Sequence, residues 1–172
     1  MGKRDYMTTV SKSPTVVLPR PDEKTKLSDI FFALTRQLSE QFYINRGVLV
    51  LRDRGSDNLA AVSTWQNGNA REGLAIRLPS EKSLFEHVAE DGQIYTEDYC
   101  GSFSGNFFER KLLIDESSRS FVLHPIKHEG EVVGLLGFSS EEALAFSLFE
   151  EGAMDQVMSD FAELIHRCEV TE

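Results

Sequence analysis

The most apolar part of the chain lies between residues 120 and 140, where two runs rich in Val, Phe and Leu flank the polar segment 127–131. Short apolar runs joined by a polar connection that contains glycine are typical of two antiparallel strands, and these runs are apolar enough to be buried on both faces. Two strands alone are marginally stable, so the rest of the chain must supply further strands and helices. The pattern therefore predicts a hairpin in the middle of a larger sheet.

Three segments have the apolar spacing of amphipathic helices. Residues 27–42 carry Leu, Ile and Phe side chains on one face. A short helix follows, with Ser80 as its N-cap and Gly92 as its left-handed stop. A long terminal helix is predicted over residues 154–165, after a capping box at residues 147–150.

Shorter apolar runs predict the remaining strands, at residues 48–53, 59–65, 74–78 and 93–96. The least regular part of the chain is the segment 98–119, which mixes aromatic residues with Gly, Ser and Asn. A helical turn or two is expected at residues 107–114. Irregular segments of this length inside a compact domain are uncommon and usually functional.

Composition and charge narrow the class of protein. The net charge of the 172 residues is −10 and the pI is ≈ 4.9, which argues against binding to nucleic-acid phosphates or to an anionic membrane surface. No apolar run approaches the roughly 18 to 20 residues of a transmembrane helix, and the N-terminus lacks the apolar core of a signal peptide. Cys100 and Cys168 are far apart, which suits a reducing compartment. We therefore expect a cytoplasmic protein without a nucleic-acid or membrane partner.

The ends of the chain differ in composition from its middle. Residues 1–24 contain prolines and mixed charges but little apolar surface, which is typical of a flexible tail. We expect a single domain over residues 25–168, followed by a short tail at residues 169–172.

Several spaced patterns resemble those of a GAF domain, a sensor module related to PAS domains. The patterns include Leu78-Pro79, Gly92 to Tyr95, Asp98, Pro125-Ile126 and Val133-Gly134. The resemblance covers residues 27–167. It implies an α+β fold with a five- or six-stranded antiparallel sheet, the N- and C-terminal helices packed on one face, and a loop-roofed pocket on the other.

Cys100 is the residue that suggests catalysis or cofactor attachment. The resemblance raises two chemistries for it, thioether attachment of a bilin and redox catalysis on methionine sulfoxide. Bilin-binding relatives usually have histidine after the cysteine, where this chain has Gly101, and the reductase relatives use a cluster of cysteines. A lone cysteine without a neighbouring base is usually unreactive, so we expect no enzyme activity.

Two polar patterns favour structural roles. Asp115-Glu116 resembles the acidic end of a motif found in cyclic-nucleotide-binding GAF domains, but Lys111 stands where that motif has an aromatic residue. A solvated acidic turn is therefore expected. His124 and His128 are four residues apart on a strand and its turn, where side chains do not converge, so no metal site is predicted. We expect His124 to be half-buried with one hydrogen-bond partner.

Aromatic residues give the main candidate for a ligand site. Aromatic walls with a few polar tips suit a planar ligand, although the same side chains would also fill a core. The candidates are Trp65, Tyr95, Asp98, Tyr99, Phe103, Phe107, Phe108, Phe121 and His124. Gly101, Gly105 and Asn106 give the segment 98–119 the freedom to open and to close over a ligand, so we expect it to be the most mobile ordered part of the chain.

Two functions remain open at this stage, and a third is less favoured. The first is a non-enzymatic sensory module that binds an unknown small molecule and transmits its occupancy through the terminal helices. The second is a dimerisation or docking module with a collapsed pocket, which serves a partner kinase or regulator. The third is an enzyme of the methionine sulfoxide reductase type. The sequence identifies no ligand or cofactor, and the apolar stripes of the first and last helices predict a homodimer.

Overall fold

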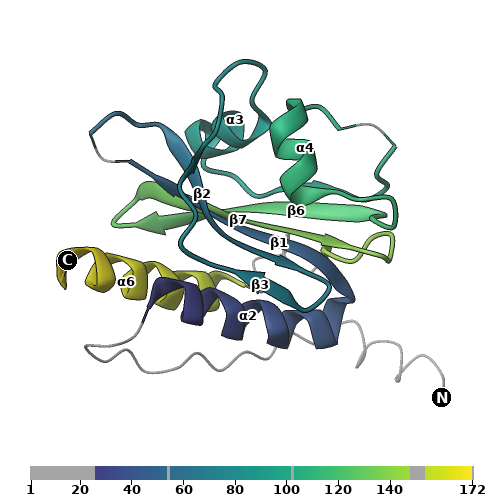
Figure 1. The fold of residues 1–172 in the computed structure, drawn as a ribbon, viewed down its shortest axis with the longest axis horizontal. Helices are drawn as coiled ribbons and strands as arrows, with labels where there is room; N and C mark the ends of the chain where they lie inside the picture. The colour runs from purple at the N-terminus through teal and green to yellow at the C-terminus, as the bar shows by residue number, and fades with distance from the viewer. Residues whose placement is uncertain (1–25, 54, 102, 148–153, 172) are drawn as a thin grey trace.

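The computed structural model describes residues 26–53, 55–101, 103–147 and 154–171, so the predicted tail at 1–24 lies outside the described residues. A sheet separates two helical layers (Figure 1). Its strands are β1 (Ile44–Arg52), β2 (Leu59–Gln66), β3 (Asn69–Arg71), β4 (Ile76–Arg77), β5 (Tyr95–Glu97), β6 (Ser120–His128) and β7 (Glu131–Ser140). The helices are α2 (Leu27–Phe42), α3 (Leu84–Asp91), α4 (Phe107–Leu113) and α6 (Asp155–Thr171).

The strands are ordered β3-β2-β1-β7-β6-β5, and β4 pairs with β2. Every pairing is antiparallel, which confirms the α+β prediction. The described residues form seven strands rather than five or six. The difference arises beside β2, where residues 69–71 form a strand that was not predicted, and the predicted strand 74–78 is reduced to β4.

The predicted hairpin is confirmed as β6 and β7. Glu129 and Gly130 form its two-residue turn with φ values of 53° and 85°, and two consecutive positive φ values suit the twist of the flanking strands. β7 also pairs with β1, so the hairpin lies inside the sheet as expected.

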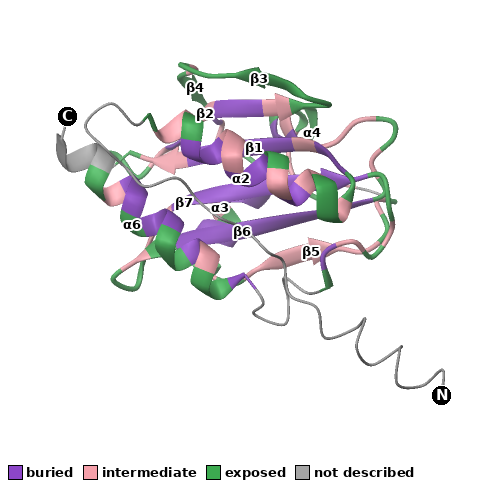
Figure 2. Ribbon diagram, turned by 90° about the horizontal axis from the view of Figure 1, so that it is seen from below, coloured by how far each residue is buried: buried purple, intermediate pink, exposed green. Residues whose placement is uncertain are grey.

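Each face of the sheet has its own apolar core. Figure 2 looks onto the face covered by α2 and α6 and shows the buried strands behind these helices. This core includes Ile30, Phe31, Leu34, Val122, Ile126, Phe138, Phe161 and Ile165. The core under α3 includes Val48, Val50, Leu84, Phe85, Val88, Leu113, Phe121 and Leu123. The terminal helices therefore pack on one face as predicted, whereas two helices and their connections cover the other.

The helix ends agree with the sequence pattern in part. Gly92 ends α3 in the left-handed region, as predicted, but the N-cap is Ser83 rather than Ser80, since the Ser83 side chain accepts a hydrogen bond from the Glu86 amide. α6 runs to Thr171, past the predicted domain boundary at 168. The predicted capping box lies partly outside the described residues. No helix in the described ranges has an apolar stretch long enough to cross a membrane.

Candidate functional site

The predicted site residues lie on both faces of the sheet. Phe121 belongs to the core under α3, whereas Trp65 packs against the core under α2 and α6. His124 lies three residues from Phe121 on the same strand, and successive side chains of a strand point to opposite faces. It consequently lines a cavity with Met158 of α6, so the structure does not bring Trp65 and His124 together with Phe121.

Three of the predicted aromatic residues form a stack on the α3 and α4 face. The Tyr95 and Phe121 ring centroids are 5.9 Å apart at an interplanar angle of 27°, and those of Phe103 and Phe121 are 5.5 Å apart at 51°. Phe121 is buried and contacts both of the other rings, while Tyr95 and Phe103 are half-buried. Tyr95, Phe103 and Phe121 are called the aromatic stack below.

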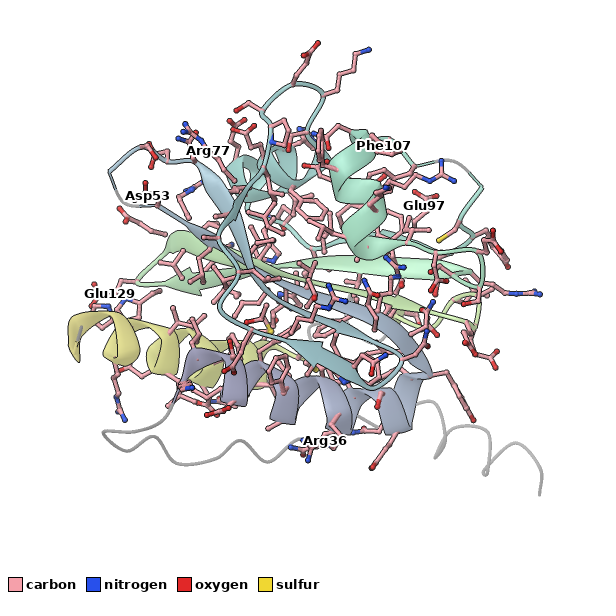
Figure 3. All side chains as sticks on the ribbon, in the orientation of Figure 1. Arg36, Asp53, Arg77, Glu97, Phe107 and Glu129 are labelled. Atoms are coloured by element: carbon pink, nitrogen blue, oxygen red, sulfur yellow. The ribbon has the colours of Figure 1, made fainter. Side chains whose placement is uncertain are left out.

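Three further predicted aromatic residues are mostly exposed to solvent. Tyr99, Phe107 and Phe108 are 65%, 64% and 54% exposed. Phe107 lies at the end of α4 farther from the sheet, and Lys111 Nζ lies 5.0 Å from its ring centroid (Figure 3). Asp98 is half-buried, and its carbonyl oxygen accepts a hydrogen bond of 3.0 Å from the Leu144 amide.

Glu109 of α4 is a buried carboxylate that sequence reasoning missed. Its side chain is fully buried and accepts hydrogen bonds from the amides of Leu84 at 2.8 Å and Phe85 at 3.2 Å, and from the Ser83 hydroxyl. It also accepts from the amide of its own N-cap, Asn106, at 3.3 Å. The sequence Asn106-x-x-Glu109 has the spacing of a capping box and was the available signal.

The prediction of a solvated acidic turn holds only for the exposed Glu116. It is wrong for Asp115, which is half-buried and bound by neighbouring side chains. Asn45 Nδ2 donates to Asp115 Oδ1 at 2.8 Å, and Arg46 Nε donates to Oδ2 at 3.3 Å. Burial raises the pKa of the Asp115 carboxyl, but hydrogen bonds from Ser117 and the charge of Arg46 outweigh burial and hold the pKa below its usual value. The network fixes the connection between α4 and β6 to β1.

His124 is more buried than expected, with only 5% of the residue exposed. Its Nδ1 lies 3.0 Å from the Pro125 carbonyl oxygen. Burial lowers its pKa, and the nearby charge of Lys127 adds to this effect, while the Pro125 carbonyl and Asp155 oppose it. The cavity beside it measures about 430 Å³ and also includes Ile94 and Ser159 in its lining.

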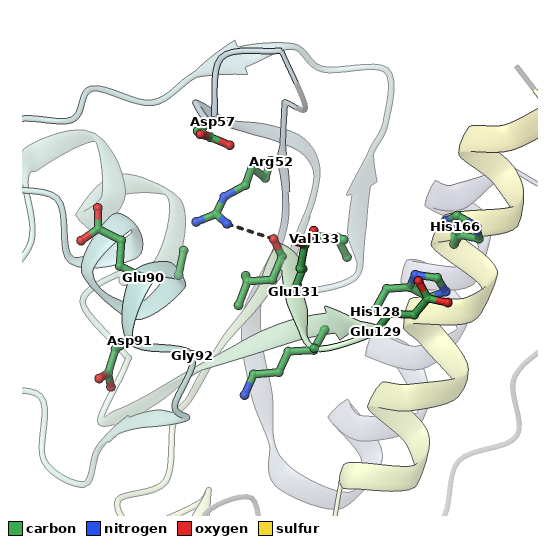
Figure 4. Close-up of a pocket in the computed structure, with 14 residues that line it drawn as sticks. Arg52, Asp57, Glu90, Asp91, Gly92, His128, Glu129, Glu131, Val133 and His166 are labelled. Carbon is green, nitrogen blue, oxygen red and sulfur yellow. Dashed lines mark hydrogen bonds between the residues drawn. The ribbon is translucent and has the colours of Figure 1, made fainter.

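A larger groove of about 980 Å³ lies between the β6–β7 turn, the end of α3 and α6 (Figure 4). Arg52 Nη1 donates to the Val132 carbonyl oxygen at 3.1 Å across its floor. The His128 and His166 rings stack with centroids 4.1 Å apart, and His128 Nε2 lies 3.3 Å from Glu163. Within the described ranges, no group of three or more His, Cys, Asp or Glu side chains is arranged to hold a metal ion.

Comparison with protein families decides the family. The sequence matches the GAF domain family over residues 26–165. The chain belongs to the GAF domain family. No curated protein matches the sequence.

Solved structures share the fold of this GAF domain. The GAF domain of a two-component sensor histidine kinase from Bacillus halodurans is 20% identical with a TM-score of 0.67, covering 84% of this chain and 97% of that one. The GAF domain of a phosphoenolpyruvate-protein phosphotransferase from Coxiella burnetii is 18% identical with a TM-score of 0.65, covering 97% and 92%. A type II free methionine-R-sulfoxide reductase from Thermoplasma acidophilum is 17% identical with a TM-score of 0.60, covering 82% and 93%. At these identities the likeness establishes the fold alone.

Cys100 of the GAF domain is half-buried and packs against the same apolar core as the aromatic stack. Burial, and to a lesser extent the charge of Glu97, raises the pKa of its thiol to about 11. Since the thiolate is the nucleophile, this environment disfavours attack on a sulfoxide or a bilin at neutral pH.

Proposed function

We propose that this GAF domain is a non-catalytic sensory module of the cytoplasm, which binds a small molecule against the aromatic stack. The proposal rests on how the segment 98–119 covers Phe121. The segment 98–119 packs one aromatic side chain, Phe103, onto Phe121, while Tyr99, Phe107 and Phe108 of the same segment remain exposed. These exposed aromatic side chains are therefore available to cover a bound solute.

Energetics support opening and closing of this segment. Burial of aromatic area contributes about 25 cal/mol per Å², which opposes the entropy cost of ordering the segment. With a ligand present, the exposed aromatic side chains gain a surface to cover. In the free protein they gain nothing by moving inward, because the core under α4 is already filled by Phe121, Leu123 and Leu113.

β6 provides a route from the stack to the terminal helices. Phe121 and Leu123 belong to the core under α3, whereas Val122 and Ile126 belong to the core shared with Met158 and Phe161 of α6. A shift of β6 caused by a ligand at Phe121 would therefore move side chains packed on α6. Transmission through α2 and α6, and a homodimer formed by them, are part of the proposal.

Native mass spectrometry of the protein incubated with a cell metabolite extract tests ligand binding. We expect an added small-molecule mass that is lost in Phe103→Ala, which dismantles the stack, and retained in Ile76→Ala, whose side chain is exposed on β4 outside the segment 98–119. A wild-type spectrum that shows only the bare polypeptide after incubation with extracts from several growth conditions would contradict the proposal.

A docking module is the second candidate, because two adjacent phenylalanines on α4 are exposed beside Lys111. On this account the exposed phenylalanines carry the binding, and the stack does not. Binding of a partner protein would be lost in Phe107→Ala and kept in Phe103→Ala. The effect of Phe103→Ala therefore separates the two functions.

A further inference from the structure

α4 has the reverse of the usual amphipathic pattern. Its two N-terminal phenylalanines are more than half exposed, while the next residue, Glu109, is fully buried. Burying a carboxylate is costly unless hydrogen bonds replace its water, so the position of Glu109 requires a specific compensating contact. That contact determines how α4 is held.

The compensation comes from the start of α3. The first amides of a helix lack partners within the helix and carry partial positive charge. Glu109 accepts hydrogen bonds from two of them, at Leu84 and Phe85, and from the side chain of the N-cap Ser83. None of these donors is a charged side chain, so α4 is held to α3 by a buried carboxyl group bound to a helix terminus.

The same carboxylate adjoins the aromatic stack. A Cβ atom added to Gly105 would collide with both Glu109 Oε1 and the Phe103 ring. Both side chains therefore lie against the backbone of residue 105. Phe103 in turn lies on Phe121, so displacement of Glu109 would loosen the cover of the stack directly.

The opposite end of α4 is anchored to the sheet. Leu113 is fully buried and would contact a Cβ placed on Gly137 of β7 at 3.1 Å. Arg46 of β1 donates a hydrogen bond to the Lys111 carbonyl oxygen. If the contact at Glu109 is lost, the N-terminal end of the helix can swing while its C-terminal end stays attached.

We propose that Glu109 is a latch: its carboxylate, bound to the N-terminus of α3, holds residues 103–110 closed over Phe121, and its release opens them without unfolding the sheet. This opening would let a ligand reach the aromatic stack, a consequence that rests on the proposed function. The latch itself does not rest on it.

Hydrogen exchange on the full chain tests the latch in Glu109→Gln, which keeps the shape of the side chain but places an amide group against the α3 donors. We expect amides of residues 103–110 to exchange at least about ten-fold faster than in wild type, with residues 120–140 unchanged. Glu116→Gln, an exposed carboxylate a few residues away, is the matched control and should behave as wild type. Unchanged exchange in 103–110, or an equal increase in 120–140, would overturn the latch.

Chemical rescue separates the latch from a general packing role. In Glu109→Ala we expect formate to restore protection of residues 103–110, because it can occupy the vacated carboxylate position, while chloride at the same ionic strength does not. Equal effects of formate and chloride would contradict the proposal. If Glu109→Ala does not fold, Ser83→Ala removes one donor and should give a smaller increase in the same amides, and no increase there would also overturn the latch.

The exchange experiment on Glu109→Gln tests the latch independently of whether the protein binds a small molecule. Faster exchange in Glu109→Gln together with no bound mass in either wild type or variant would leave the latch in place and refute the small-molecule function. A bound mass in wild type with unchanged exchange in Glu109→Gln would do the reverse.

Discussion

Gly134 shows how one missing side chain permits strand pairing in the centre of the sheet. It pairs with Leu51 of β1 and with Ile126 of β6. A Cβ atom at this position would overlap the carbonyl oxygen of Val50 and lie 3.3 Å from Leu51 Cδ2. The backbone oxygen cannot move aside without breaking the ladder, so the tolerance for any side chain is low.

Replacing Gly134 by Val should lower the free energy of unfolding by more than about 2 kcal/mol, because the branched side chain overpacks a strand flanked on both sides. Urea denaturation measures this change. Gly55→Val is the matched control, since its added Cβ would meet only Asp53 Oδ1 at 3.9 Å. A denaturation midpoint for Gly134→Val equal to that of wild type would contradict the close approach of β1 and β7.

Cys100 should react slowly with alkylating reagents. With a pKa of about 11, its thiol presents at neutral pH about a hundredth of the thiolate of an ordinary cysteine. In a Cys168→Ser variant, iodoacetamide should therefore modify Cys100 about 100-fold more slowly than free cysteine. The urea-unfolded variant should react at the ordinary rate, and a native rate as fast as that one would reopen the question of catalysis.

At the scale of elements, a polar network joins β1, β7 and the connection from α4 to β6. Asn45 is buried in β1 and links Asp115 to Ser139 of β7, whose hydroxyl donates to Asn45 Oδ1 at 3.0 Å. Every member has its partner within the network, and such networks lose more than one bond when a member is removed.

The network should make stability depend on pH. Because folding holds the pKa of Asp115 below its unfolded value of about 3.9, its stabilisation is fully present above that pH and is lost as the pH falls through the folded pKa. Asp115→Asn should therefore be less stable than wild type at neutral pH, and the difference in urea midpoint should shrink below about pH 4. A difference that stays constant down to pH 2 would contradict this assignment.

The elements differ in how far the sequence predicts them. Periodicity identifies α2 and the β6–β7 hairpin, because their apolar positions report directly on burial. It also implies that His124 and Phe121 face opposite ways, a consequence that the prediction of one shared site overlooked. The inward position of Glu109 on α4 could not be inferred from hydrophobicity, since it depends on donors from α3 about 25 residues earlier. The position of the Asp115 carboxylate, bound by Asn45 and Arg46, likewise depends on contacts made only in the folded chain.

At the scale of the whole molecule, α2 and α6 leave apolar side chains partly uncovered. Phe32, Phe42 and Val157 are only half-buried against the core beneath these helices. A second copy packed on this face would cover them, and cyclic dimers are the commonest oligomers of soluble proteins. We therefore expect a homodimer through α2 and α6.

Sedimentation velocity at micromolar concentration should show this dimer, and Phe32→Glu should convert it to a folded monomer. Ile76→Glu, at an exposed position on β4, is the control and should leave the dimer intact. A wild-type protein that sediments only as a monomer, or a variant Phe32→Glu that remains dimeric, would exclude this interface.

In the proposed function, a cover closes over the aromatic stack and opens while the sheet stays folded. Hydrogen exchange of the free wild-type protein, resolved by segment, tests it most directly. We expect residues 103–110 to exchange at least about 100-fold faster than the β6–β7 hairpin, because local opening needs less free energy than global unfolding. Equal protection of the two segments would mean that the stack is permanent core, and the docking module would then be the better description of this GAF domain.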